Sequence, residues 1–205
     1  MKVKVCGLST PEQVKTCVDN NASFCGFILN YPKSHRYITY ENAHKLTQVN
    51  RLKTKYVGVL VRPTVEELKK FSNLNLDYFQ IYGDYDDKYL FDIKNKYKKK
   101  IIMALQITKK EDVFNYEKVK NSADIILWDS SGLEKSIAWT YDWIKSVPNN
   151  ITKMIAGDIT IEKVRKISDF ADIIDVSGAL ETNKVKDINK IIKFLNETSK
   201  INHEN

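Results

Sequence analysis

The sequence predicts an α/β protein that forms a single (β/α)8 barrel over residues 1–205. Eight short apolar runs recur along the chain, and helix-like stretches separate them. Most of the runs are continuously apolar, which is typical of parallel strands buried on both faces. No linker rich in glycine, serine or proline divides the chain, and its length lies near the lower limit of this fold, at about 200 residues.

The expected strands follow one another at regular intervals: residues 3–7, 23–29, 55–61, 78–83, 100–107, 124–129, 153–157 and 172–178. Start signals for helices lie between them. Thr10, with Pro11 and Gln13, combines an N-cap, a proline in the first turn and a capping-box partner. The remaining expected helix starts are Thr64 with Glu67, Thr108 with Glu111, Thr39 and Thr160.

The helix signals in the C-terminal part of the chain differ in strength. The unit after residue 129 is the weakest, because residues 130–147 predict only a short helix. The last predicted helix carries an apolar face made of Val185, Ile188, Ile191, Ile192 and Leu195, and its polar tail from Glu197 is expected to fray. A doubly wound open sheet is the alternative, but it normally carries a G-x-G-x-x-G fingerprint, which the "CGLSTPE" segment lacks.

Composition argues against several classes of protein. The net charge is +7, but lysines alternate with acidic residues, so the dense run at 94–100 predicts a solvated surface rather than a nucleic-acid site. No run approaches the roughly 20 apolar residues of a membrane span, and the N-terminus turns polar too early for a signal peptide. Three cysteines without a pairing pattern indicate a reducing compartment, and we expect a cytoplasmic protein. The three histidines lack partners at ligand spacing, so no metal is expected.

A barrel of this kind carries its active site where the carboxyl ends of its strands meet. Glycine- and serine-containing turns follow the last two expected strands, and their backbone N–H groups predict a phosphate site. The residues of that site are Gly157, Asp158, Ser177, Gly178 and Ala179. The alternative is that these residues only permit tight turns.

Cys6 and Asp129 end the first and sixth expected strands, on roughly opposite sides of the barrel mouth. A cysteine is more often a core residue, and Asp129 is also suited to cap the turn that follows it. A helix N-terminus after Cys6 would, however, lower the pKa of the thiol below its usual ~8.5. A thiolate base facing a protonated acid suits an isomerisation. Arg36 lies between tyrosines and is either a carboxylate ligand or a plain surface residue.

The stretches that carry these residues occur in a fixed order: KVCGLS at 4–9, GFILNYPKSHRYI at 26–38, VGVLV at 57–61, FQIYG at 79–83, LWD at 127–129, AGDI at 156–159 and DVSGALE at 175–181. Together they resemble the phosphoribosylanthranilate isomerase family, whose motifs are K-[IV]-C-G-[IL]-[ST], G-F-[VI]-F-x-P-x-S-x-R-Y, V-G-V-F-V, L-Q-L-H-G, L-L-D, G-G-L and D-V-S-S-G-V-E. The resemblance runs from residue 2 to about residue 181.

The resemblance implies a cofactor-independent Amadori rearrangement of N-(5'-phosphoribosyl)anthranilate to the corresponding 1-deoxyribulose 5-phosphate, in tryptophan biosynthesis. It implies that Asp129 is the general acid, that Cys6 is the general base and that Arg36 holds the anthranilate carboxylate. The other implied substrate contacts are Gln80, Tyr82 and Asp175, with the phosphate held by the turns at 157–158 and 177–179. We therefore expect a small phosphorylated substrate, no cofactor, no nucleic-acid or membrane partner, and a monomer or weak homodimer.

The sequence departs from the family pattern at four points. Tyr82 stands where the family usually has histidine, and Asp158 stands where a second glycine is usual. The G-G-[ST]-G loop after the acid is replaced by residues 130–139, where Lys135 or Ser136 would have to substitute. The glycine of DVSGALE is shifted by one position. The rival interpretations are a sugar-phosphate epimerase, a bifunctional sugar isomerase, and a non-catalytic barrel that binds a phosphorylated ligand or RNA.

Overall fold

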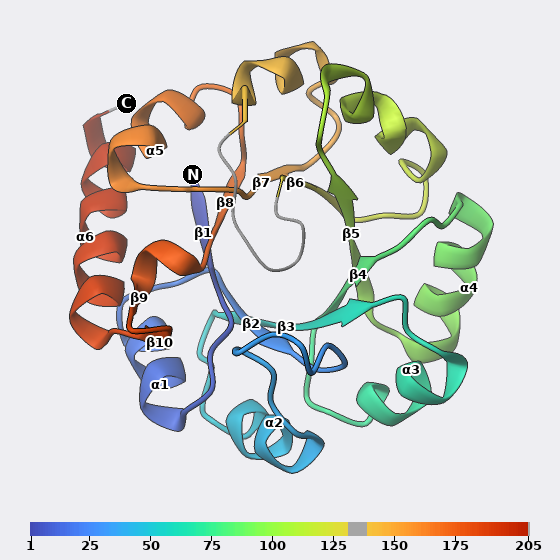
Figure 1. The fold of residues 1–205 in the computed structure, drawn as a ribbon, viewed down its shortest axis with the longest axis horizontal. Helices are drawn as coiled ribbons and strands as arrows, with labels where there is room; N and C mark the ends of the chain where they lie inside the picture. The colour runs from blue at the N-terminus through green and yellow to red at the C-terminus, as the bar shows by residue number, and fades with distance from the viewer. Residues whose placement is uncertain (131–138, 205) are drawn as a thin grey trace.

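Eight parallel strands close into a barrel in the computed structural model, which describes residues 1–130 and 139–204 (Figure 1). The strands are β1 (Lys2–Cys6), β2 (Phe24–Ile28), β3 (Lys55–Val61), β4 (Tyr78–Tyr82), β5 (Lys100–Gln106), β6 (Ile125–Asp129), β7 (Lys153–Ile155) and β8 (Ile173–Val176). Each strand pairs with the next in chain order, and β8 pairs with β1. The predicted barrel is confirmed, and the open-sheet alternative is wrong.

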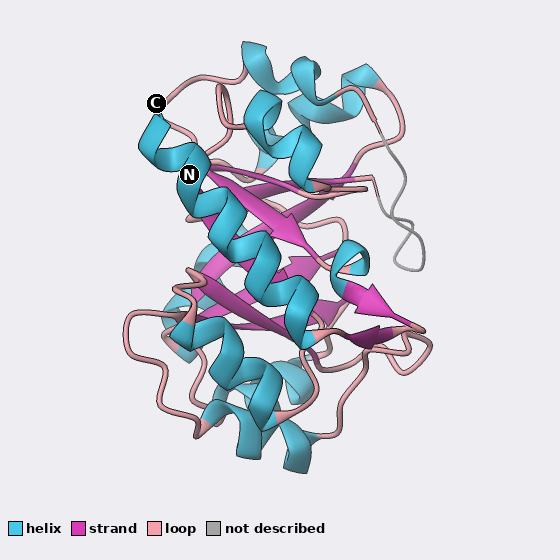
Figure 2. Cartoon of the chain, turned by 90° about the vertical axis from the view of Figure 1, so that its left-hand side faces the viewer, coloured by secondary structure: helices cyan, strands magenta, loops and turns pink. Residues whose placement is uncertain are grey.

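Helices surround the strands as a ring, which Figure 2 shows from the side. They are α1 (Pro11–Asp19), α2 (Tyr40–Thr47), α3 (Val65–Ser72), α4 (Asp87–Tyr97), α5 (Ile161–Ile167) and α6 (Ile188–Glu204), with 3-10 helices η1 (Lys110–Lys118), η2 (Tyr141–Ser146) and η3 (Gly178–Leu180). A short hairpin of β9 (Glu181–Thr182) and β10 (Val185–Lys186) follows η3. No described helix is long and apolar enough to cross a membrane.

Most of the predicted helix starts are confirmed. Thr10 and Thr64 form capping boxes at α1 and α3, and the hydroxyl of Thr39 caps α2. The signal at Thr108 is wrong in detail, because Asp112 rather than Glu111 accepts the hydrogen bonds from the start of η1. Thr160 precedes α5 as its N-cap without a side-chain cap bond to any described residue.

The last helix begins later than predicted. Val185 lies in β10 and is 60% exposed, so it does not belong to the apolar face of α6. Ile191 and Leu195 are buried on that face, and α6 lies between α5 and α1 in Figure 1. Thr198 and Ile201 are also buried, and the helix continues to Glu204, so the first part of the tail packs against the barrel instead of fraying.

The barrel interior changes from apolar to polar along the strands. Inward positions repeat every two residues, as the pleat of a strand requires. On β4 the apolar Tyr78 is followed by Gln80 and Tyr82, and on β8 Ile173 is followed by Asp175. The floor of the barrel is therefore an apolar cluster made of Phe24, Val57, Tyr78, Ile102, Ala104, Ile125, Leu127, Met154, Ala156 and Ile173. The polar inward positions collect at the carboxyl ends of the strands.

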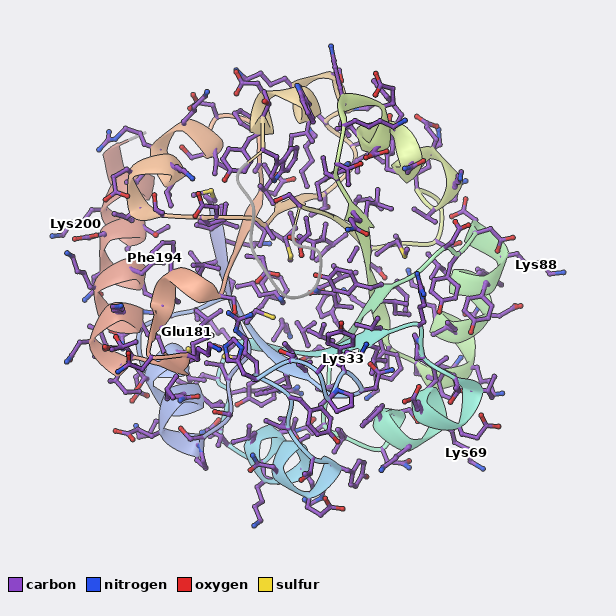
Figure 3. The ribbon with its side chains drawn as sticks, in the orientation of Figure 1. Lys33, Lys69, Lys88, Glu181, Phe194 and Lys200 are labelled. Carbon is purple, nitrogen blue, oxygen red and sulfur yellow. The ribbon has the colours of Figure 1, made fainter. Side chains whose placement is uncertain are left out.

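The lysines that dominate the charge lie mostly at the outer rim. In Figure 3, Lys69, Lys88 and Lys200 extend away from the barrel, whereas Glu181 lies among the ribbons of the C-terminal hairpin. The dense run at 94–100 spans the end of α4 and the start of β5, where Lys96 and Lys98 are exposed. Lys94 pairs with Asp124, and Lys99 donates to the carbonyls of Leu74 and Leu76, so part of the run is engaged within the protein.

Candidate active site

A cavity of about 440 Å³ opens at the carboxyl ends of the strands. Every residue predicted for the site contributes to its wall: Cys6, Arg36, Gln80, Tyr82, Asp129, Gly157, Asp158, Asp175, Ser177, Gly178 and Ala179. Lys135 and Ser136, named above as substitutes for the missing glycine-rich loop, lie outside the described residues. The barrel therefore brings together residues that are separated by up to about 170 positions in the chain.

Cys6 and Asp129 face this cavity from β1 and β6, and both are buried. The expected lowering of the thiol pKa is wrong. Burial raises the pKa of Cys6 above its ordinary value, although the nearby Lys4 ammonium works in the opposite direction. The helix α1 begins only after its N-cap Thr10, four residues further along the chain.

A buried ion pair lies beside Cys6. Lys4 is fully buried on β1, and its Nζ lies 2.7 Å from Oδ2 of Asp175 on β8. Burial alone would lower the pKa of Lys4, but Asp175 and Cys6 raise it overall, so the lysine stays charged. The sequence analysis did not single out Lys4. The signal that could have found it is a lysine at an inward position of a buried strand, two residues before the cysteine.

Tyr82 links two other polar residues of the wall. Its hydroxyl donates to Oδ2 of Asp129 at 2.8 Å and accepts from Nε2 of Gln80 at 3.2 Å. Burial and the Asp129 carboxylate raise the pKa of Tyr82 well above its ordinary value, so the phenol keeps its proton and donates it. A phenol thus makes the hydrogen bond to the acid at the position where the family usually has histidine.

Two buried acceptor oxygens of the wall have no hydrogen-bond partner among the described residues. They are Oε1 of Gln80 and Oδ1 of Asp175. Unpaired buried acceptors are rare in folded proteins because the lost hydration costs free energy. Both side chains line the cavity, so a ligand that carries hydroxyl groups would satisfy them.

Arg36 is oriented by a carboxylate that the sequence analysis missed. Its Nε and Nη2 donate to Glu181 at 2.5 and 3.0 Å, which leaves the other edge of the guanidinium for a ligand. Lys186 also binds Glu181. Burial would raise the pKa of Glu181, but these two cations lower it to about 2. Gly7 makes room for this arrangement, since a Cβ there would lie 2.5 Å from Cδ of Arg36.

The turn after β7 has its carbonyl groups fixed from outside the cavity. Nε1 of Trp139 donates to the carbonyl of Ala156 at 2.8 Å, and the hydroxyl of Tyr141 donates to the carbonyl of Gly157 at 2.6 Å. Neither aromatic side chain lines the cavity. Because C=O and N–H point in opposite directions in a trans peptide, the N–H groups of Gly157 and Asp158 are directed toward the cavity.

The carboxylate of Asp158 does not oppose an anion at this turn. It is paired with the ammonium of Lys163 on α5, which also donates to the carbonyl of Asp158 at 2.9 Å. Asp158 adopts a positive φ of 47°, next to Gly157 at 97°. In the turn after β8, the hydroxyl of Ser177 donates to the carbonyl of Cys6 at 2.9 Å. The hydroxyl of Ser177 is therefore engaged, which leaves the backbone of this turn to face the cavity.

Within the described part of the chain, no group of three or more His, Cys, Asp or Glu side chains is placed to hold a metal ion. The fold is a (β/α)8 barrel with a polar cavity at the carboxyl ends of its strands, which is where enzymes of this architecture carry their active sites. The model of the N-(5'-phosphoribosyl)anthranilate (PRA) isomerase family matches residues 3–197. The chain belongs to the phosphoribosylanthranilate isomerase family, the isomerases of tryptophan biosynthesis.

Individual relatives agree with this assignment. The chain is 37% identical over 204 residues to the N-(5'-phosphoribosyl)anthranilate isomerase of Streptococcus mutans, covering 97% of this chain and 99% of the relative. It is 34% identical to the Streptococcus gordonii enzyme, covering 95% of each. The solved phosphoribosyl anthranilate isomerase of Thermotoga maritima superimposes with a TM-score of 0.84 at 25% identity, over 98% of this chain and 99% of that chain.

One solved relative carries a ligand. It is a phosphoribosyl anthranilate isomerase in complex with reduced 1-(o-carboxyphenylamino)-1-deoxyribulose 5-phosphate. Its TM-score is 0.82 at 24% identity, over 98% of this chain and 99% of that chain, and at this identity the likeness concerns the fold. The family model and the curated relatives show that the chain is an isomerase, so the alternative of a non-catalytic binding barrel is wrong.

Proposed function

We propose that the cavity converts N-(5'-phosphoribosyl)anthranilate to 1-(2-carboxyphenylamino)-1-deoxyribulose 5-phosphate by general acid–base catalysis, with Asp129 as the acid and Cys6 as the base. The observation that carries this proposal is the placement of the two groups on one cavity, from β1 and β6. An acid and a base on two sides of a bound sugar would each reach a different atom, the ring oxygen and the C2 carbon.

The reaction proceeds in three stages. Asp129 gives a proton to the furanose ring oxygen, the bond from that oxygen to C1 breaks, and the nitrogen lone pair forms a C1=N Schiff base. Cys6, as a thiolate, removes the proton from C2, and the electron pair moves to the nitrogen to give an enolamine. The enolamine then tautomerises to the ketone: C1 gains a proton, the C2 hydroxyl loses its own, and the C=O bond forms at C2. Atoms and electrons balance within the substrate, so the proposed step requires no cofactor.

The rest of the wall would orient the substrate. The free edge of Arg36 would bind the anthranilate carboxylate, since Glu181 occupies the opposite edge. Gln80 and Asp175 offer acceptor oxygens to the ribose hydroxyl groups. The backbone N–H groups at Gly157 and Asp158, together with the turn formed by Ser177, Gly178 and Ala179, would hold the phosphate. The ligand named for the solved relative carries the same three features, a carboxyphenyl group, a sugar chain and a phosphate.

The setting of the protein is part of the proposal. We propose one barrel domain over residues 1–205, which acts in the cytoplasm as a monomer or weak homodimer without a nucleic-acid partner. Three free and buried thiols suit a reducing compartment. A relative from Thermotoga maritima is described as dimeric, so sedimentation velocity over a range of concentrations is the appropriate measurement for this chain.

A turnover assay with phosphoribosylanthranilate tests the roles of the acid and the base. Cys6→Ser and Asp129→Asn should each lower kcat by at least ~100-fold, because each removes one proton-transfer group. Cys17→Ala is the matched control, since Cys17 is a buried thiol on α1 away from the cavity wall. Full activity of either site variant would rule out the assigned role, and equal loss in the control would show that the effect is structural.

A further inference from the structure

Lys4 is a buried cation that the proposed mechanism does not use. Its side chain is fully buried inside the barrel, where it meets Asp175 at 2.7 Å. Burying a charged pair costs several kcal/mol in lost hydration, and an apolar pair of the same size is often as stable. An ion pair at this position therefore points to a use other than stability.

The geometry places the Lys4 ammonium beside the Cys6 thiol. Gly26 on β2 pairs in register with Cys6. A Cβ built on Gly26 would lie 2.9 Å from Sγ of Cys6 and 3.2 Å from Nζ of Lys4. The thiol and the ammonium thus approach the same small volume, which stays open only because this strand position carries no side chain.

The charges around Cys6 come from several elements. Lys4 on β1 and Lys186 on β10 favour its thiolate, and Asp175 on β8 opposes it. Arg36, in the loop after β2, interacts with the same thiol. Tyr82 and Cys25 also face the thiol, but they add no charge at neutral pH. Burial raises the pKa of Tyr82 well above its ordinary value, and a hydrogen bond with Cys17 raises that of Cys25.

These groups leave one positive charge without a partner. The cations are Lys4, Arg36 and Lys186, and the carboxylates bound to them in the described structure are Asp175 and Glu181. A thiolate at Cys6 would bring the cluster to neutrality, which is the favourable condition for charges removed from water.

We propose that Lys4 is the positioning residue of the Cys6 base: its ammonium, anchored by Asp175, is the counter-ion that stabilises the thiolate inside the barrel. The assignment of Cys6 as the base rests on the proposed function. The effect of Lys4 on the ionisation of Cys6 is a property of the protein without substrate, so it can be measured separately from turnover.

The test follows the alkylation of Cys6 by iodoacetamide as a function of pH, with the modified peptide identified by mass spectrometry. The reagent reacts with the thiolate, so the rate reports the fraction ionised. Lys4→Met should slow alkylation at about pH 7 by at least ~10-fold and raise the midpoint of its pH profile by about one unit or more. The acid limb of the pH profile of kcat/KM should move in the same direction.

Two further variants keep the test decisive. Lys4→Met/Asp175→Asn removes both buried charges, so no carboxylate is left unpaired and we expect it to fold where Lys4→Met alone does not. It should keep an upward shift, smaller than that of Lys4→Met because Asp175 opposes the thiolate. Lys153→Met is the matched control, because Lys153 is another buried strand lysine and its Nζ donates to Asn149 at 3.3 Å, away from the cavity wall. Its alkylation profile should match that of the wild type.

An unchanged midpoint in the folded Lys4 variants, or an equal shift in Lys153→Met, would overturn the proposal. These results are distinguishable from a failure of the proposed function. If the wild type shows no turnover but the Lys4 variants shift the midpoint, the ion pair stands and the assigned reaction falls. If turnover depends on Cys6 but the midpoint of the alkylation profile is unchanged in the Lys4 variants, the assigned reaction stands and the counter-ion role of Lys4 is wrong.

Discussion

Replacing Tyr82 by phenylalanine removes the hydroxyl group that joins Gln80 to Asp129. The phenol donates to the Asp129 carboxyl group at 2.8 Å, inside a site where Asp129 is 5% exposed. Without this bond the carboxyl group loses one of the contacts that hold it in the position at which it would meet the ring oxygen of the substrate. The aromatic ring itself remains, so the packing against the apolar floor of the barrel is kept.

The size of the effect follows from the two hydrogen bonds that are lost. A hydrogen bond to a charged group, which Asp129 becomes as it releases its proton, contributes about 1.5–3 kcal/mol, and each 1.4 kcal/mol is about tenfold in rate. Tyr82→Phe should therefore lower kcat by ~10- to 100-fold with KM changed much less, because the acid acts in the transition state. The free energy of unfolding should fall by about 1–3 kcal/mol, since Nε2 of the buried Gln80 loses its acceptor.

Steady-state kinetics and urea unfolding measure both quantities. Tyr82→His is the matched control, because an imidazole offers an N–H donor at the position where related sequences usually carry histidine. It should retain most of the wild-type kcat. The reasoning is refuted if Tyr82→Phe keeps kcat within twofold of the wild type, or if it raises KM alone, which would make Tyr82 a ligand of the substrate and not a support of the acid.

Three further variants test the walls of the cavity. Tyr141→Phe frees the Gly157 carbonyl and should raise KM and the inhibition constant of inorganic phosphate by ~3- to 10-fold at unchanged kcat, whereas an unchanged constant would mean that the turn needs no support. Gly7→Ala should raise KM at least as much, because the new methyl group would lie 2.5 Å from Cδ of Arg36, and wild-type kinetics would contradict that contact. The pKa of Glu181 is lowered from 4.5 to about 2, so its ion pairs stabilise the fold above about pH 4.5 and are lost as the pH falls toward 2. Urea unfolding should accordingly show wild type and Glu181→Gln converging over that range, and a constant difference would refute the assignment.

The sequence was sufficient for residues whose place depends on one strand alone. Cys6 and Asp129 could be placed at the barrel mouth because each ends an apolar run, and the carboxyl ends of parallel strands meet there. The turns at 157–158 and 177–179 were found for the same reason. All of these residues line one cavity in the structure.

Residues that depend on pairing between distant strands could not be predicted. Lys4 and Asp175 meet only because β1 and β8 are adjacent in the closed barrel, with the two residues directly opposite in register. The alternation of lysine and valine at residues 2–5 is also the pattern of a half-exposed strand, which conceals a buried lysine. Arg36 and Glu181 lie 145 residues apart in the chain. The direction of the thiol pKa was mistaken because burial, which one sequence does not reveal, is the largest influence on it.

The outward-fixed carbonyl groups of the turn after β7 bear on how such a site tolerates change over evolution. A ligand held by main-chain N–H groups depends on the path of the backbone and not on which side chain each position carries. Asp158 can therefore occupy a place usually taken by glycine, provided that its backbone keeps a positive φ and its carboxylate finds a partner such as Lys163. Side-chain substitutions in this segment are therefore compatible with unchanged binding of the ligand. Loss of the aromatic donors Trp139 and Tyr141, which lie outside the segment, would weaken binding.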